Sequence, residues 1–105
     1  MSDYLVISSE RARELLATEP MTVLDLRDQR SYRAGHIDGA VMLHDGLMQA
    51  LLKQNELDKP ILLYCYRGAK SQERAQQLAD LGFRQVYNLD GGYTAWNKQG
   101  EGSDG

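Results

Sequence analysis

The chain has 105 residues, of which 42% are hydrophobic and 26% charged, enough for one modest core and too few for two ordinary domains. This composition is typical of a folded soluble protein rather than a disordered one. Twelve Lys and Arg against fifteen Asp and Glu give a net charge of -3, which argues against a nucleic-acid partner, since such proteins bind phosphates through basic residues.

Nothing in the sequence indicates a secretory signal or a membrane anchor. Residues 4–7 are apolar, but this run is too short for the core of a signal peptide and follows Asp3. No other apolar run approaches the length of a membrane span. Cys65 is the single cysteine, so it has no disulfide partner in the chain and no cysteine cluster that could bind a metal. We therefore expect a cytoplasmic protein with a free thiol, no metal and no membrane partner.

In the first half of the chain, short β-type runs alternate with helical patterns, which is typical of an α/β domain with a largely parallel sheet. Strands are predicted over residues 4–7, 22–26 and 41–43. The first is followed by a helix from Ser8 or Ser9 to about Ala17. The second is followed by a short helix that Asp28 caps and that ends at Gly35 in a left-handed conformation. The third is followed by a helix capped by Asp45, with apolar residues at helical spacing.

The second half begins with a continuous apolar run over residues 61–64, which predicts a central strand covered on both faces. Cys65 lies at its carboxyl end. A helix from Ser71 that stops at Gly82, a strand over 85–89, a turn at 91–92 and a last helix over 93–98 are expected next. Residues 100–105 contain no apolar side chain, so we expect a domain over 1–99 and a disordered tail over 100–105.

The position of Cys65 points to chemistry. Ligands in open α/β sheets bind beyond the carboxyl ends of strands. If residues 66–70 curl around the thiol, their backbone N–H groups form a nest for an anion, and the helix at Ser71 adds its positive end. Such a setting lowers the pKa of a thiol from its free value near ~8.5 and makes it nucleophilic without a dedicated base.

The composition of the loop supports this interpretation. Gly68 can adopt the positive φ that a backbone converging on a small anion needs. Arg67 and Lys70 favour a small anionic substrate, whereas Glu73 would oppose a thiolate and is expected to point outward. The catalytic candidate is therefore Cys65, and the predicted substrate-binding residues are Tyr66, Arg67, Gly68, Ala69, Lys70 and Ser71.

The other polar residues considered are expected to have structural roles. Asp25 and Arg27 stand at the end of a predicted strand with their side chains on the same face. They are expected to form a buried polar support near the loop or a simple structural pair. His36 is expected to be a hydrogen-bonded turn residue and His44 an exposed one, because neither has the neighbours of a metal site.

Three segments together resemble a known family. The loop Cys65-Tyr66-Arg67-Gly68-Ala69-Lys70-Ser71 resembles the active loop of single-domain rhodaneses, and residues 25–40 and 90–96 are similar to the family's first and closing signatures. By its size and its loop, the chain resembles the small bacterial thiosulfate sulfurtransferases of the GlpE type. Ser31 departs from the glutamate that many relatives carry before the aromatic residue, which should affect local packing more than chemistry.

The resemblance implies a rhodanese-like α/β fold, with a parallel five-stranded sheet flanked by helices on both faces. It also implies a reaction without metal or organic cofactor. Cys65 would take the outer sulfur of thiosulfate, release sulfite, and pass the sulfur from a persulfide to cyanide or a thiol.

Two alternatives remain open, and two others are disfavoured. Cys65 could be an inert core residue of an interaction domain, or the protein could be a sulfur relay between a protein donor and a protein acceptor. A cysteine phosphatase is disfavoured, since its clamping arginine would stand six positions after the cysteine, where Ser71 is found. A nucleotide-binding loop is not supported, because the glycines around Lys70 are missing.

Overall fold

Strand β4 (Ile61–Tyr64) lies at the centre of a sheet of five parallel strands in the order β1-β5-β4-β2-β3. The computed structural model of the protein describes residues 3–54 and 56–102. The other strands are β1 (Leu5–Ile7), β2 (Thr22–Asp25), β3 (Val41–Met42) and β5 (Val86–Leu89). This sheet confirms the predicted fold class.

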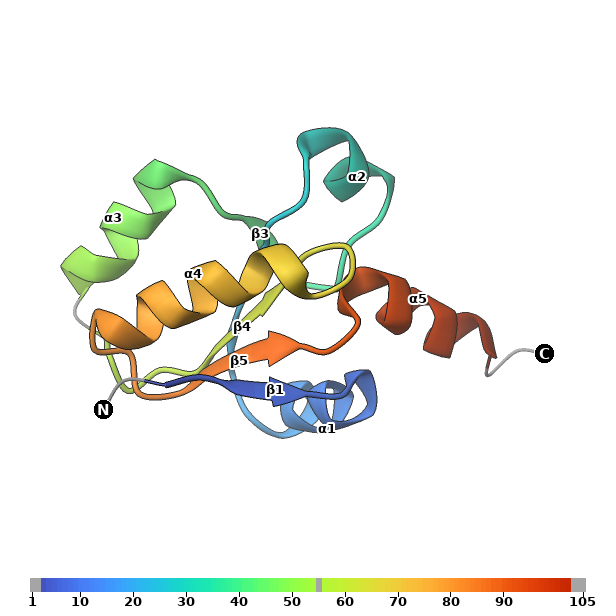
Figure 1. Cartoon of the computed structure of the whole chain (residues 1–105), viewed down its shortest axis with the longest axis horizontal. Helices are drawn as coiled ribbons and strands as arrows, with labels where there is room; N and C mark the ends of the chain where they lie inside the picture. Colours follow the sequence, from blue (N-terminus) through green and yellow to red (C-terminus); the bar gives the residue numbers. More distant parts are fainter. Residues whose placement is uncertain (1–2, 55, 103–105) are drawn as a thin grey trace.

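Helices cover both faces of the sheet (Figure 1). One face packs against α3 (Asp45–Gln54) and α4 (Ala69–Asp80), and the other against α1 (Ser9–Thr18) and α5 (Gly92–Gly102). The short helix α2 (Gln29–Ala34) contributes Tyr32 to the second face. The hydrophobic core is therefore two clusters of side chains separated by the sheet.

Alternation along β4 explains why its sequence is apolar throughout. Ile61 and Leu63 belong to the cluster under α3 and α4, whereas Leu62 and Tyr64 belong to the opposite cluster. All four are at most 1% exposed, because a central parallel strand is covered on both sides. The next residue is Cys65, so the cysteine stands at the carboxyl end of the most buried strand.

Two helix starts differ from the prediction. Asp45 does not cap α3; it is the first helical residue, and the Nδ1 atom of His44 accepts the cap hydrogen bond from the N–H of Leu47 at 3.2 Å. Helix α4 begins at Ala69, two residues before the expected Ser71. The early start follows from Gly68, whose left-handed backbone (φ 95°) turns the chain directly into the helix.

Two helix ends also differ from the prediction. Gly35 follows α2 as predicted, but its φ of 166° is extended rather than left-handed. Its small size matters instead, because a Cβ there would lie 3.0 Å from the hydroxyl of Tyr93. Helix α5 continues to Gly102, so it does not end at Lys98, and residues 100–102 of the expected tail have helical backbone. Residues 103–105 lie outside the described residues, and the division at residue 99 stays a prediction.

No helix within residues 3–54 and 56–102 combines the length and the apolar character that crossing a bilayer requires.

Candidate active site

The sulfur of Cys65 lies inside a tight loop between β4 and α4. The N–H of Gly68 donates to Sγ at 3.1 Å, and the hydroxyl of Ser71 lies 3.4 Å from the same atom. Backbone N–H groups of Arg67 and Ser71 also favour the anionic form of the sulfur. The expected inward-facing amides are therefore present, and α4 directs its positive end toward the thiol.

The N-terminus of α5 fixes the other side of the loop backbone. The N–H of Tyr93 donates to the carbonyl of Cys65 at 2.8 Å, and the N–H of Thr94 donates to the carbonyl of Tyr66 at 3.0 Å. These bonds direct two carbonyl oxygens toward α5. Gly92 makes the approach possible, because a Cβ there would lie 2.5 Å from the Cys65 oxygen.

Buried Asn88 ties the loop to β5. Its side-chain nitrogen donates to the carbonyl of Gly68 at 3.1 Å, and its side-chain oxygen accepts from the hydroxyl of Ser71. The same hydroxyl also lies 3.3 Å from the Gly68 carbonyl and within reach of the sulfur. A hydroxyl has one proton to donate, so Asn88, Gly68 and Cys65 compete for that of Ser71.

These donors control the charge of the thiol. Burial alone would raise the pKa of Cys65, but hydrogen bonds from the Ser71 hydroxyl and from the amides of Ser71, Gly68 and Arg67 outweigh it. The pKa of Cys65 is therefore lowered from its ordinary value. A thiolate in this loop is available at lower pH than a free cysteine, as a nucleophile requires.

The Ser71→Ala variant is expected to show a Cys65 pKa closer to that of an ordinary thiol. Loss of one hydrogen bond to the anion, worth about 1 kcal/mol, should lower the ratio of thiolate to thiol at a given pH roughly fivefold. The rate of alkylation by iodoacetamide, measured against pH, reports the midpoint. Ser8→Ala removes a hydroxyl that caps α1 and is the matched control, with an expected midpoint equal to that of the parent. An unshifted midpoint in Ser71→Ala would assign the whole effect to the backbone amides.

Asp25 and Arg27 form a buried ion pair beside the loop. Asp25 is fully buried and Arg27 is 8% exposed, and Nη2 of the arginine lies 2.8 Å from Oδ2 of the aspartate. The hydroxyl of Tyr64 also donates to Asp25, at 2.6 Å, and burial together with this bond raises the pKa of Tyr64 well above its usual value. A second donation from Arg27 Nη2 reaches the carbonyl of Gly35 at 2.5 Å. This pair therefore joins the ends of β2 and β4 to the segment after α2, without contacting the sulfur.

Tyr66 connects the loop to the start of α2. Its hydroxyl donates to Asp28 at 2.5 Å and lies 2.6 Å from the hydroxyl of Ser31. The bond from Tyr66, followed by that from the Ser31 N–H, lowers the pKa of Asp28 to about 2. Ser31 thus takes part in a hydrogen-bond network that includes the loop.

The loop leaves its nucleophile little open surface. Cys65 is only 2% exposed, whereas Tyr66, Arg67, Ala69 and Lys70 are exposed around it. A reagent or substrate must therefore approach the sulfur between these exposed residues. Glu73 is exposed, in agreement with its expected outward orientation.

The ring nitrogens of the two histidines bond to groups outside the sulfur loop. The ring of His36 stacks on Tyr32 with centroids 3.9 Å apart, and its Nδ1 lies 2.7 Å from the Tyr32 carbonyl. His44 is exposed and caps α3. No group of three His, Cys, Asp or Glu side chains that could hold a metal ion occurs among the described residues.

Comparison with known proteins identifies the family. The profile of the Rhodanese-like domain matches residues 8–99. The chain belongs to the rhodanese-like family. It is 42% identical over 90 residues to a protein of Pseudoalteromonas translucida named thiosulfate sulfurtransferase GlpE, covering 86% of each chain. A protein of the same name from Shewanella oneidensis is 36% identical over 98 residues, covering 93% of this chain and 97% of the relative.

Solved structures agree with the family. The Rhodanese-like domain of an Anabaena protein, solved by NMR, superposes with a TM-score of 0.79 at 26% identity and covers 93% of this chain and 76% of that one. A rhodanese-related protein from Thermoplasma volcanium has a TM-score of 0.75, also at 26% identity, with 92% and 94% covered. The family resemblance expected from the loop and its flanking segments is confirmed.

Sequence reasoning missed three parts of this rhodanese-like site. The dipeptide Gly91-Gly92 was interpreted only as a turn, although Gly92 lets α5 touch the loop. The α5 amides that bind the loop carbonyls left no mark in the side-chain pattern. Asn88 did leave a signal, because an amide side chain within an otherwise apolar strand needs a buried partner.

Proposed function

We propose that the protein is a thiosulfate sulfurtransferase in which Cys65 carries the transferred sulfur as a persulfide. The observation that supports this most is the direct donation to Cys65 Sγ from the Gly68 N–H, with Ser71 at 3.4 Å. These donors stabilise negative charge on Sγ, which is the attacking atom of the thiolate and the leaving atom when the persulfide is discharged. The names carried by the relatives of the family agree with this reaction.

The first step is attack by the Cys65 thiolate on the outer sulfur of thiosulfate. A bond forms between Sγ and that sulfur, the sulfur–sulfur bond of thiosulfate breaks, and sulfite leaves with the electron pair. Cys65 thereby becomes a persulfide. The lowered pKa of Cys65 increases the share of the attacking thiolate, which needs no residue to remove a proton during the attack.

The second step returns the enzyme to its starting state. A thiophilic acceptor, cyanide or a thiolate, attacks the outer sulfur of the persulfide, and the bond to Sγ breaks. The Cys65 thiolate leaves with the electron pair and is again stabilised by the loop amides. Sulfur moves between nucleophiles in both steps, so their balance requires no external oxidant or reductant.

The positive charge of the loop and the low exposure of Cys65 are suited to a small anionic sulfur donor. Arg67 and Lys70 lie exposed on the loop of a protein whose net charge is -3, so they form a local positive region. Cys65 is 2% exposed, so the donor has to present its outer sulfur to the loop first. We assign binding of the donor to the backbone of residues 66–71, with Arg67 and Lys70 attracting it.

Intact mass spectrometry after incubation with thiosulfate tests the proposal. The protein is expected to gain one sulfur atom and to release one equivalent of sulfite, because each transfer breaks one thiosulfate. Sulfate is the matched control, since it carries the same charge but no transferable sulfur. An unchanged mass with thiosulfate would contradict the proposal. Slow loading from thiosulfate with fast loading from a persulfide-bearing protein would identify a relay instead.

A further inference from the structure

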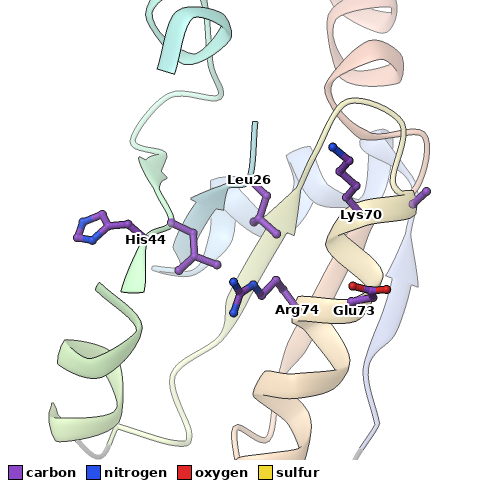
Figure 2. A pocket seen from close by; sticks show the side chains of 7 residues that line it. Leu26, His44, Lys70, Glu73 and Arg74 are labelled. Carbon is purple, nitrogen blue, oxygen red and sulfur yellow. The ribbon is translucent and has the colours of Figure 1, made fainter. Parts of the chain in front are cut away.

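A cleft of about 570 Å³ opens beside the sulfur loop, along the first turns of α4. Its apolar wall consists of Leu26, Leu43 and Ala69, and its charged side chains, Lys70, Glu73 and Arg74, come from α4. Figure 2 shows Arg74 extending from α4 toward the apolar wall and Lys70 pointing toward the loop, whereas the ring of His44 points away. The cleft therefore combines an apolar wall with two cations.

Backbone connections place this cleft next to the reacting sulfur. The N–H of Leu26 donates to the carbonyl of Tyr64 at 2.9 Å, so Leu26 lies alongside the end of β4, where Cys65 follows. On the other side, Ala69 comes directly after Gly68, whose N–H binds Sγ. One side of the cleft thus adjoins the end of β4, and the other continues directly from the loop that holds Cys65.

The size of the cleft exceeds what the donor needs. Pockets for small organic molecules measure roughly 300–1,000 Å³, and this cleft lies in that range, whereas thiosulfate is only a sulfate-sized ion. The persulfide also extends the reactive atom outward by one sulfur–sulfur bond, about 2 Å. A bulkier molecule that cannot reach Sγ itself can therefore attack the outer sulfur from this side.

The charged residues of the cleft indicate what kind of molecule it binds. Lys70 and Arg74 stand one helical turn apart on α4, and Glu73 is the single acidic residue that lines the cleft. The cleft thus has an excess of positive charge in an acidic protein. A carboxylate would pair with Arg74, whose planar guanidinium suits it, while short methylene groups would contact Leu26 and Leu43.

We propose that this cleft binds the sulfur acceptor and that the acceptor is a small aliphatic thiol bearing a carboxylate. The proposal rests on the persulfide reaction described above. The acceptor thiolate forms a bond to the outer sulfur of the persulfide and becomes a persulfide itself. The bond to Sγ breaks, and Cys65 leaves as the thiolate with the electron pair. Arg74 is a binding and specificity residue in this step.

Discharge of the persulfide by two thiols of different charge tests the acceptor site. Loaded protein, freed from thiosulfate, is mixed with 3-mercaptopropionate or with neutral 2-mercaptoethanol, and rates are compared per thiolate. The anionic thiol is expected to react faster. Arg74→Gln should slow its discharge two- to fivefold, the effect of a partly exposed ion pair, and leave the rate with 2-mercaptoethanol within experimental error. Added salt should reduce the difference.

Arg84→Gln is the matched control, because Arg84 is an exposed arginine that pairs with Asp58 before β5, at the opposite end of the sheet. Its discharge rates are expected to equal those of the parent. Equal slowing of both thiols by Arg74→Gln, or no preference for the anionic thiol in the parent, would overturn the acceptor site. Discharge by a protein thiol alone would overturn it in favour of a macromolecular acceptor.

The loading step is measured separately for every variant, so the two proposals fail in different ways. Failure of the parent to load from thiosulfate contradicts the sulfurtransferase. The persulfide is then prepared with polysulfide, and the same comparison of thiols still decides the acceptor site.

Discussion

The Cys65→Ser variant is expected to take up no sulfur from thiosulfate while it keeps the fold. A serine oxygen fits the same space and can accept the bonds that Gly68 and Ser71 direct at the sulfur. Its hydroxyl does not ionise near neutral pH without a base, so it is no nucleophile for a sulfane sulfur. Intact mass spectrometry should show an unchanged mass, and the free energy of unfolding should fall by about 1 kcal/mol or less.

A second measurement separates binding from chemistry in this variant. The anion site is built mostly from backbone, so thiosulfate should still raise the melting temperature of Cys65→Ser at high ligand concentration. Cys65→Ala is the matched control, with the same lack of reaction but without an oxygen for the loop donors. Because Cys65 is the single cysteine of the chain, sulfur uptake by either variant would place the acceptor atom elsewhere and refute the persulfide.

The Gly92→Ala variant is expected to lose both stability and sulfur loading. Its new Cβ would lie 2.5 Å from the Cys65 oxygen and 2.6 Å from the carbonyl of Tyr66, and these backbone atoms cannot rotate away. Helix α5 must therefore shift, which breaks the bonds that its amides make to both carbonyls. Overpacking and two lost hydrogen bonds together should cost about 3–5 kcal/mol. Urea denaturation and the loading rate measure the two effects, and loading should fall at least about tenfold.

Gly39→Ala is the matched control for this variant. Gly39 and Gly92 both have positive φ, at 84° and 58°, but a Cβ on Gly39 would meet nothing within 4 Å. Gly39→Ala therefore reports backbone strain alone, about 1–2 kcal/mol, and should load sulfur at the parent rate. Equal losses in the two variants would mean that the contact between α5 and the loop contributes nothing.

Much of the fold could be predicted because its signals are local. The apolar run at residues 61–64 indicated a central strand, and β4 is that strand with both faces covered. Helix boundaries were harder, because they depend on single residues. Asp45 matched the usual preference for an N-cap, but the adjacent His44 supplies the bond through a ring nitrogen, which composition rules do not anticipate.

The candidate site, like the fold, could be predicted where its signals are local and not where they depend on distant residues. The loop from Cys65 to Ser71 is continuous in sequence, so its glycine, its cations and its helix start could be interpreted together. The groups that orient this loop come from distant parts of the chain, namely Asn88 and the amides at the start of α5. Contacts between backbone atoms leave no side-chain signature, so the pattern of residues could not reveal them.

The competition for the Ser71 proton links the charge on the sulfur to the packing of the sheet. When Cys65 is uncharged, the proton goes to the oxygen of Asn88 and joins α4 to β5. The thiolate is a stronger acceptor than the uncharged sulfur and draws the proton away from Asn88, which weakens the connection between α4 and β5. Each turnover should then alternately weaken and restore one buried hydrogen bond between a helix and a strand. The chemical state of Cys65 would thereby affect the packing of α4 on β5, outside the loop that holds the sulfur.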